Sequence, residues 1–170
     1  MKIAAFVLAL LLTVPFGVWI GVRVAYVISF DIQCEGHLKR AGDANTIKLA
    51  HQELESALEY VESHNLTQGS THLMFPTPEC DVTFWYDNLQ SARDELEAIP
   101  AGTSQLEKTN ILMKLRETLL DSGERGVSAT VPPGITIFPY QWLFLLWGWF
   151  SFLFCLIAWC VFFGVLMVTD

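Results

Sequence analysis

Apolar positions run almost unbroken at both ends of the chain, whereas apolar and polar positions alternate in the middle. From residue 3 to residue 30 the only charged side chain is Arg23, and residues 126–169 carry none. About 20 apolar helical residues cross the roughly 30 Å hydrocarbon core of a bilayer. We therefore expect transmembrane helices at residues 1–30 and 138–168, a water-soluble domain at residues 31–125 and a linker at 126–137.

The soluble domain is expected to contain about three amphipathic helices. The first extends from about residue 31 to 64, the second opens at Thr77 and Pro78, and the third opens with a capping box formed by Ser104 and Glu107. Apolar residues recur at spacings of three and four along each, and the second has a coiled-coil-like seam. These stripes comprise Ile47, Ala50, Leu54, Ala57, Leu58 and Val61; Val82, Trp85, Leu89, Ala92, Leu96 and Ile99; and Leu112, Leu115 and Leu119. The expected fold class is all-α, with a soluble antiparallel helical bundle between the two membrane helices.

Two details of these helices are less firmly set by the pattern. The first helix either continues through Gly42 or breaks near Gly42 and Asp43, with Asn45 recapping it. We favour continuity, because glycine costs only about 1 kcal/mol in a helix interior. The third helix is expected to stop at Gly123.

Small residues form a stripe along each expected membrane helix. Close approach between membrane helices depends on such residues, because lipid supplies no hydrophobic force to join them. The N-terminal stripe comprises Ala5, Ala9, Thr13, Gly17 and Gly21, and the C-terminal stripe comprises Gly148, Ser151, Cys155 and Ala158. We expect the two stripes to serve helix packing, either within the chain or with another protein.

Aromatic residues gather at two places. Twelve lie between residues 138 and 163, where they are expected to face lipid or a partner protein. Phe84, Trp85 and Tyr86 form the densest aromatic group in the soluble domain. Three successive residues cannot share one helix face, so core packing of this group is favoured over a docking patch for a partner.

Topology rests on a weak charge signal. Lys2 follows Met1 and precedes a long apolar run without a clear cleavage site, which is typical of an uncleaved signal-anchor. Lys2 favours a cytoplasmic N-terminus, whereas Arg23, Lys39 and Arg40 lie at or beyond the far end of the span. We expect an integral protein of the bacterial inner membrane with both termini cytoplasmic and the soluble domain extracytoplasmic.

The charge is concentrated in the soluble domain. The whole chain of 170 residues has a formal net charge of −8. An acidic surface repels nucleic acid, so nucleic-acid binding is discounted. Cys34 and Cys80 are the cysteines of this domain, and a disulfide between them is as plausible as two free thiols.

Motifs for catalysis or cofactor binding are absent from the sequence. None of the four histidines follows a glutamate at the spacing of di-iron bundles, and no phosphate loop or nucleophile elbow occurs. Cys34 and His37, with His72 and Cys80, make only a weak zinc pattern. We therefore expect no enzyme activity, cofactor or metal.

These observations favour a non-enzymatic two-pass membrane protein. Its helical domain is expected to mediate protein–protein interaction or assembly of a larger membrane complex, with lipid and a protein partner or a second copy of the chain as its contacts. The alternatives are a homo-oligomeric pore-forming or membrane-perturbing protein, and a small membrane-bound sensor. A pore needs a polar helix face, which neither expected span has.

Overall fold

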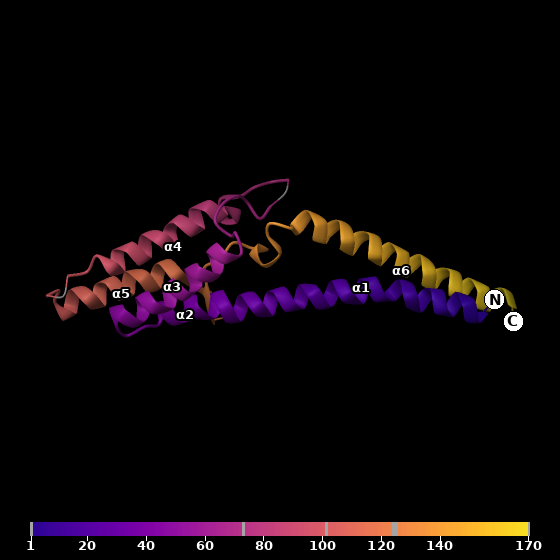
Figure 1. Cartoon of the computed structure of the whole chain (residues 1–170), viewed down its shortest axis with the longest axis horizontal. Helices are drawn as coiled ribbons and strands as arrows, with labels where there is room; N and C mark the ends of the chain where they lie inside the picture. The colour runs from indigo at the N-terminus through magenta and orange to yellow at the C-terminus, as the bar shows by residue number, and fades with distance from the viewer. Residues whose placement is uncertain (1, 73, 101, 124–125, 170) are drawn as a thin grey trace. The chain divides into compact units, whose positions relative to one another are not determined.

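The computed structural model describes residues 2–72, 74–100, 102–123 and 126–169. The chain divides into two compact units. Unit 1 comprises residues 1–26 and 140–170, and unit 2 comprises residues 27–139. The described chain is mostly helical. Its longest helices are apolar and are the first and last helices along the chain (Figure 1). This confirms the helical fold expected from the sequence.

Unit 1 contains two helices that lie side by side (Figure 1). These are α1 (Lys2–Phe30), which continues into unit 2 at its end, and α6 (Gln141–Thr169). Both are long and apolar enough to cross a membrane. Only 6% of the apolar stretch of α1 and 11% of that of α6 are buried within the structure. A core helix of a water-soluble protein would be mostly buried, so these helices differ from that type.

Unit 2 begins with the end of α1 and continues through a π-helical turn (Asp31–Glu35) into α2 (Gly36–Gly42). The chain then turns over residues 43–46 before α3 (Ile47–Ser63), so the expected continuous helix through Gly42 is wrong. Thr46, rather than Asn45, caps α3 by accepting the Leu49 N–H at 3.3 Å. A Cβ at Gly42 would meet the Leu120 side chain at 2.8 Å, so glycine allows a close contact there.

The turn after α2 sends α3 back toward the start of unit 2. Phe30, at the end of α1, makes an edge-on contact with Tyr60 in the last part of α3, with ring centroids 5.9 Å apart. It is therefore this turn, and not the loop after α3, that first reverses the chain. The loop after α3 begins a few residues beyond Tyr60 and leads to α4.

The next two helices are α4 (Val82–Glu97) and α5 (Gln105–Leu119). Ser104 accepts the Glu107 N–H at 3.2 Å, as its capping position predicts. Thr77 and Pro78 instead open a 3₁₀ turn (Pro78–Cys80), and Asp81 caps α4 by accepting the Phe84 N–H at 3.0 Å. The expected start of this helix was therefore four residues too early.

The core of unit 2 is built from the predicted apolar stripes. Within it α2 packs on α3 and α5, and α3 packs on α4. Most stripe residues are buried, including Leu54, Val61 and Leu89, while Ile47, Ile99 and Leu112 are half-buried at the margin. Complete burial of one leucine side chain contributes about 1.5–3 kcal/mol, so this face is the main stabilising feature of the unit.

A short β-hairpin follows α5, where the sequence had suggested the end of a helix and a linker. Strands β1 (Leu120–Gly123) and β2 (Gly126–Ala129) pair antiparallel, with Leu120 opposite Ala129. Helix α5 therefore ends at Leu119 rather than at Gly123, and the expected all-α fold is corrected by this element. Leu120 and Ala129 are buried, so the hairpin belongs to the core. A 3₁₀ turn (Ile135–Ile137) then leads to α6.

Candidate functional site

The small residues of α6 lie on the face that contacts α1. Gly148, Ser151 and Ala158 are buried, and Cys155 is half-buried. A Cβ at Gly148 would come within 2.7 Å of the Trp19 indole, so the absence of a side chain there makes room for this ring. The Trp19 N–H also donates to the Phe144 carbonyl at 2.8 Å.

The small residues of α1 divide between two surfaces. Ala9 is buried, and Ala5 and Thr13 are half-buried. The Thr13 hydroxyl accepts the Trp159 indole N–H at 3.1 Å and lies 3.5 Å from Cys155 Sγ. Gly17 and Gly21, by contrast, are exposed, and a Cβ at either would have no neighbour within 4 Å among the described residues. Only the first half of this stripe therefore takes part in the contact with α6.

The aromatic group on α4 is spread over three environments. Trp85 is buried, and its indole N–H donates to the Thr130 carbonyl at 2.8 Å. The Tyr86 hydroxyl donates to Glu62 at 2.8 Å, and burial, followed by this hydrogen bond, raises the pKa of Tyr86. Phe84 is 63% exposed. Only Phe84 therefore offers most of its ring to a partner.

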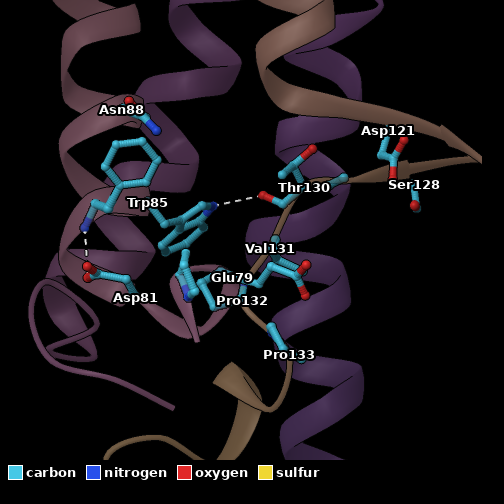
Figure 2. A pocket seen from close by; sticks show the side chains of 13 residues that line it. Glu79, Asp81, Trp85, Asn88, Asp121, Ser128, Thr130, Val131, Pro132 and Pro133 are labelled. Atoms are coloured by element: carbon cyan, nitrogen blue, oxygen red, sulfur yellow. Dashed lines mark hydrogen bonds between the residues drawn. The ribbon is translucent and has the colours of Figure 1, made fainter. Parts of the chain in front are cut away.

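A groove in unit 2 lies between the first turn of α4 and the segment that leaves β2. We call it the Trp85 groove; it has a volume of about 560 Å³. Figure 2 shows the Trp85 indole reaching across to Thr130, so that this hydrogen bond joins the two walls. The lining residues are Pro78, Glu79, Asp81, Phe84, Trp85, Asn88, Asp121, Ser128, Ala129, Thr130, Val131, Pro132 and Pro133.

The charge of the Trp85 groove is of one sign. Glu79, Asp81 and Asp121 line it, and among the residues that the structure describes no lysine or arginine does. All three acids are exposed, and Asp81 also caps α4. Carboxylates around an apolar floor of Phe84 and Trp85 suit a ligand that combines positive charge with an apolar stem, as lysine and arginine side chains do. The sequence did not single out Glu79 and Asp121, because the fold of the hairpin brings them to one groove from positions 42 residues apart.

Cys34 and Cys80 are buried, free thiols in the structure, so the disulfide considered from the sequence is not formed. Cys34 belongs to the hydrophobic core. Burial, and then the neighbouring Glu35 charge, raises the pKa of Cys34 to about 12. Cys80 Sγ lies 3.1 Å from the Thr77 hydroxyl. A protonated, buried thiol is a poor nucleophile, so Cys34 is best described as a packing residue.

The histidines serve local contacts. His37 Nδ1 and Arg40 Nη2 lie 2.7 Å and 3.0 Å from the Glu53 carboxylate, which ties α2 to α3. His64 stacks on Tyr60. Among the residues that the structure describes, no three His, Cys, Asp or Glu side chains are grouped to hold a metal ion. The zinc pattern of Cys34, His37, His72 and Cys80 is therefore not assembled in the described chain.

Comparison with known proteins adds no relative: no family model, curated protein or solved structure matches the chain.

Proposed function

We propose that the chain is a non-enzymatic two-pass membrane protein whose helical unit 2 binds a partner protein and joins it to a membrane complex. In this proposal α1 and α6 cross the bilayer, both termini lie in the cytoplasm, and unit 2 lies on the extracytoplasmic side of the membrane. A bacterial inner membrane suits the signal-anchor pattern at the N-terminus.

The composition and burial of α1 and α6 support the membrane placement. Their side chains, such as Leu11, Leu143 and Phe154, are apolar and exposed along the length of both helices. Soluble monomers rarely expose apolar patches larger than a few hundred Å². The indole N–H groups of Trp19 and Trp159 find acceptors across the helix pair, which matters where no water is available to accept them.

The Trp85 groove carries the proposal of a protein partner. It joins three carboxylates with the exposed ring of Phe84, and none of its described lining residues is a lysine or arginine. Charge complementarity therefore selects a basic segment of the partner, with an arginine or lysine stem lying along the apolar floor. Exposed ion pairs contribute only about 0.2–1 kcal/mol each, so affinity depends on several acting together and falls with added salt.

The experiment is photo-cross-linking from the groove in intact cells. A photoreactive phenylalanine analogue at Phe84 reports on the groove, and the adduct is sequenced by mass spectrometry. We expect a cross-linked peptide rich in lysine and arginine. The double variant Glu79→Lys/Asp121→Lys should abolish the adduct, whereas Glu55→Lys/Glu59→Lys on the exposed side of α3 changes the net charge equally and should retain it.

Two results would contradict the partner-binding part of the proposal. One is an adduct that persists in Glu79→Lys/Asp121→Lys, since the groove charge would then be irrelevant. The other is an adduct whose second peptide comes from this chain, which would favour homo-oligomerisation.

A further inference from the structure

The loop between α3 and α4 differs in chemistry from the rest of unit 2. Residues 65–78 contain no aspartate, glutamate, lysine or arginine, whereas residues 31–125 as a whole hold 17 acidic and 8 basic side chains. Met74 and Phe75 are 76% and 81% exposed, more than any other large apolar side chain recorded as exposed in the described part of unit 2. An uncharged segment with a bare apolar tip is unfavourable in water.

Hydrogen bonds fix the base of this loop. The Val82 N–H donates to the Gly69 carbonyl at 2.9 Å, and the Gly69 N–H donates to the Thr83 hydroxyl at 3.0 Å. Further along, the Thr71 N–H donates to the Cys80 carbonyl at 3.0 Å. Met74 and Phe75 therefore lie at the exposed tip of a loop whose base is held by hydrogen bonds, and they do not pack against the core.

The base of the loop lies near residues at the two ends of unit 2, from which the chain continues into α1 and α6. Gly69 packs against the Phe138 ring, since a Cβ there would meet Phe138 Cζ at 3.1 Å. Phe138 precedes the first residue of α6, Gln141, by three positions. Tyr60, a few residues before the loop, contacts Phe30 at the end of α1. One end of unit 2 thus contacts the base of this loop, and the other contacts the last part of α3, a few residues before the loop.

We propose that the 65–78 loop is an interfacial membrane contact, with Met74 and Phe75 inserted at the boundary of headgroups and acyl chains. Its occupant is lipid of the same bilayer that α1 and α6 are proposed to cross, so the inference rests on the proposed membrane placement. Apolar and aromatic side chains gain from this boundary, and the lack of charge removes the cost of bringing acids toward the headgroups. The loop would add a third attachment, beside the two helices, and limit tilting of unit 2.

The test uses the full chain in lipid nanodiscs with an environment-sensitive fluorophore at Phe75→Cys. The matched control is Leu106→Cys, whose native side chain is 73% exposed in the first turn of α5, beyond the far end of α4. Wild-type protein treated with the same label corrects for the native cysteines. Quenching is measured with a spin-labelled lipid and with aqueous iodide.

We expect quenching by the spin-labelled lipid to be at least threefold stronger at position 75 than at position 106. Quenching by iodide should be stronger at position 106 than at position 75. Equal iodide quenching at both positions, without lipid quenching, would overturn the inference. Protection of position 75 from both quenchers would also overturn it, because protein and not lipid would then cover the loop. Label at Leu153→Cys in α6 separates the failures: if it too escapes lipid quenching, the membrane placement itself is wrong.

Discussion

Substitution of Gly148 should disrupt the pairing of α1 with α6. In the structure a Cβ at this position would lie 2.7 Å from the Trp19 indole, well inside van der Waals contact. Gly148→Leu adds three more carbons beyond that atom. Overpacking of a fitted contact costs about 1–3 kcal/mol. Displacement of the indole would also break its 2.8 Å hydrogen bond to the Phe144 carbonyl, and interhelical hydrogen bonds in membranes are worth about 0.6 kcal/mol on average and at most about 1.7.

The assay uses a contact that the structure provides. Thr13 Oγ1 lies 3.5 Å from Cys155 Sγ, so Thr13→Cys should form an intrachain disulfide with Cys155 on mild oxidation. Cys160→Ser removes the nearest competitor. Together these terms cost the paired arrangement of the helices about 2–4 kcal/mol, and each 1.4 kcal/mol lowers its equilibrium constant tenfold. Gly148→Leu should therefore slow cross-linking by at least an order of magnitude.

The matched control is Gly17→Leu. A Cβ at Gly17 has no described neighbour within 4 Å, so this change adds the same carbons to the same helix pair without a clash. Cross-linking should proceed at the parental rate. Equal slowing by both substitutions, or none by Gly148→Leu, would refute the assignment of Gly148 to the contact face.

Three further predictions concern unit 2. Leu54→Ala should lower the free energy of unfolding by about 2–5 kcal/mol, because Leu54 is fully buried, whereas Leu49→Ala, at a 44% exposed position, should cost under about 1 kcal/mol in the same denaturant titration. Trp85→Phe removes the donor to the Thr130 carbonyl, so chemical denaturation should show a loss of about 1–3 kcal/mol; an unchanged midpoint would contradict this contact. Burial holds the folded pKa of Cys34 at about 12, above its unfolded value, so the contribution of this thiol to the free energy of unfolding should be complete below about pH 8 and fall as the pH rises toward 12. The variant Cys34→Ala should flatten that fall. In the native wild type, iodoacetamide at pH 8 should leave this thiol unmodified until the chain is unfolded.

The sequence predicted the features that depend on local periodicity. Residues such as Leu54, Val61, Leu89 and Leu115 recur at helical spacing, and all are buried. The capping role of Ser104 also follows from a local pattern, since the hydroxyl and the N–H that it accepts are three residues apart. Burial of these faces follows because no other arrangement of an amphipathic helix removes its apolar stripe from water.

Features that depend on distant contacts were missed. Because the penalty for glycine in a helix is small, continuity was expected at Gly42, but the tight packing of Leu120 against this position comes from a hairpin 78 residues further along. That hairpin lies in a short segment with weak strand pattern, and Leu120 and Ala129 become buried only when it folds onto the helices. The Trp85 groove was missed for the same reason, since Glu79 and Asp121 are brought together by the tertiary fold.

The small-residue stripes show a similar limit. Spacing alone placed Thr13 and Gly17 in one stripe, because four residues make slightly more than one helical turn. Each step of four advances about 40° around the helix, so a stripe of several turns leaves any single contact face. Thr13 therefore reaches α6, whereas Gly17 and Gly21 are exposed.

The central claim is that lipid surrounds α1 and α6 and that water surrounds unit 2. Nuclear Overhauser effects between lipid acyl-chain protons and assigned amides of the full chain in nanodiscs test it most directly. The account predicts cross-peaks at Leu11 and Leu153 and none at Leu54 or Leu115. Cross-peaks missing from α1 and α6, together with a folded chain that stays in solution without lipid or detergent, would contradict it.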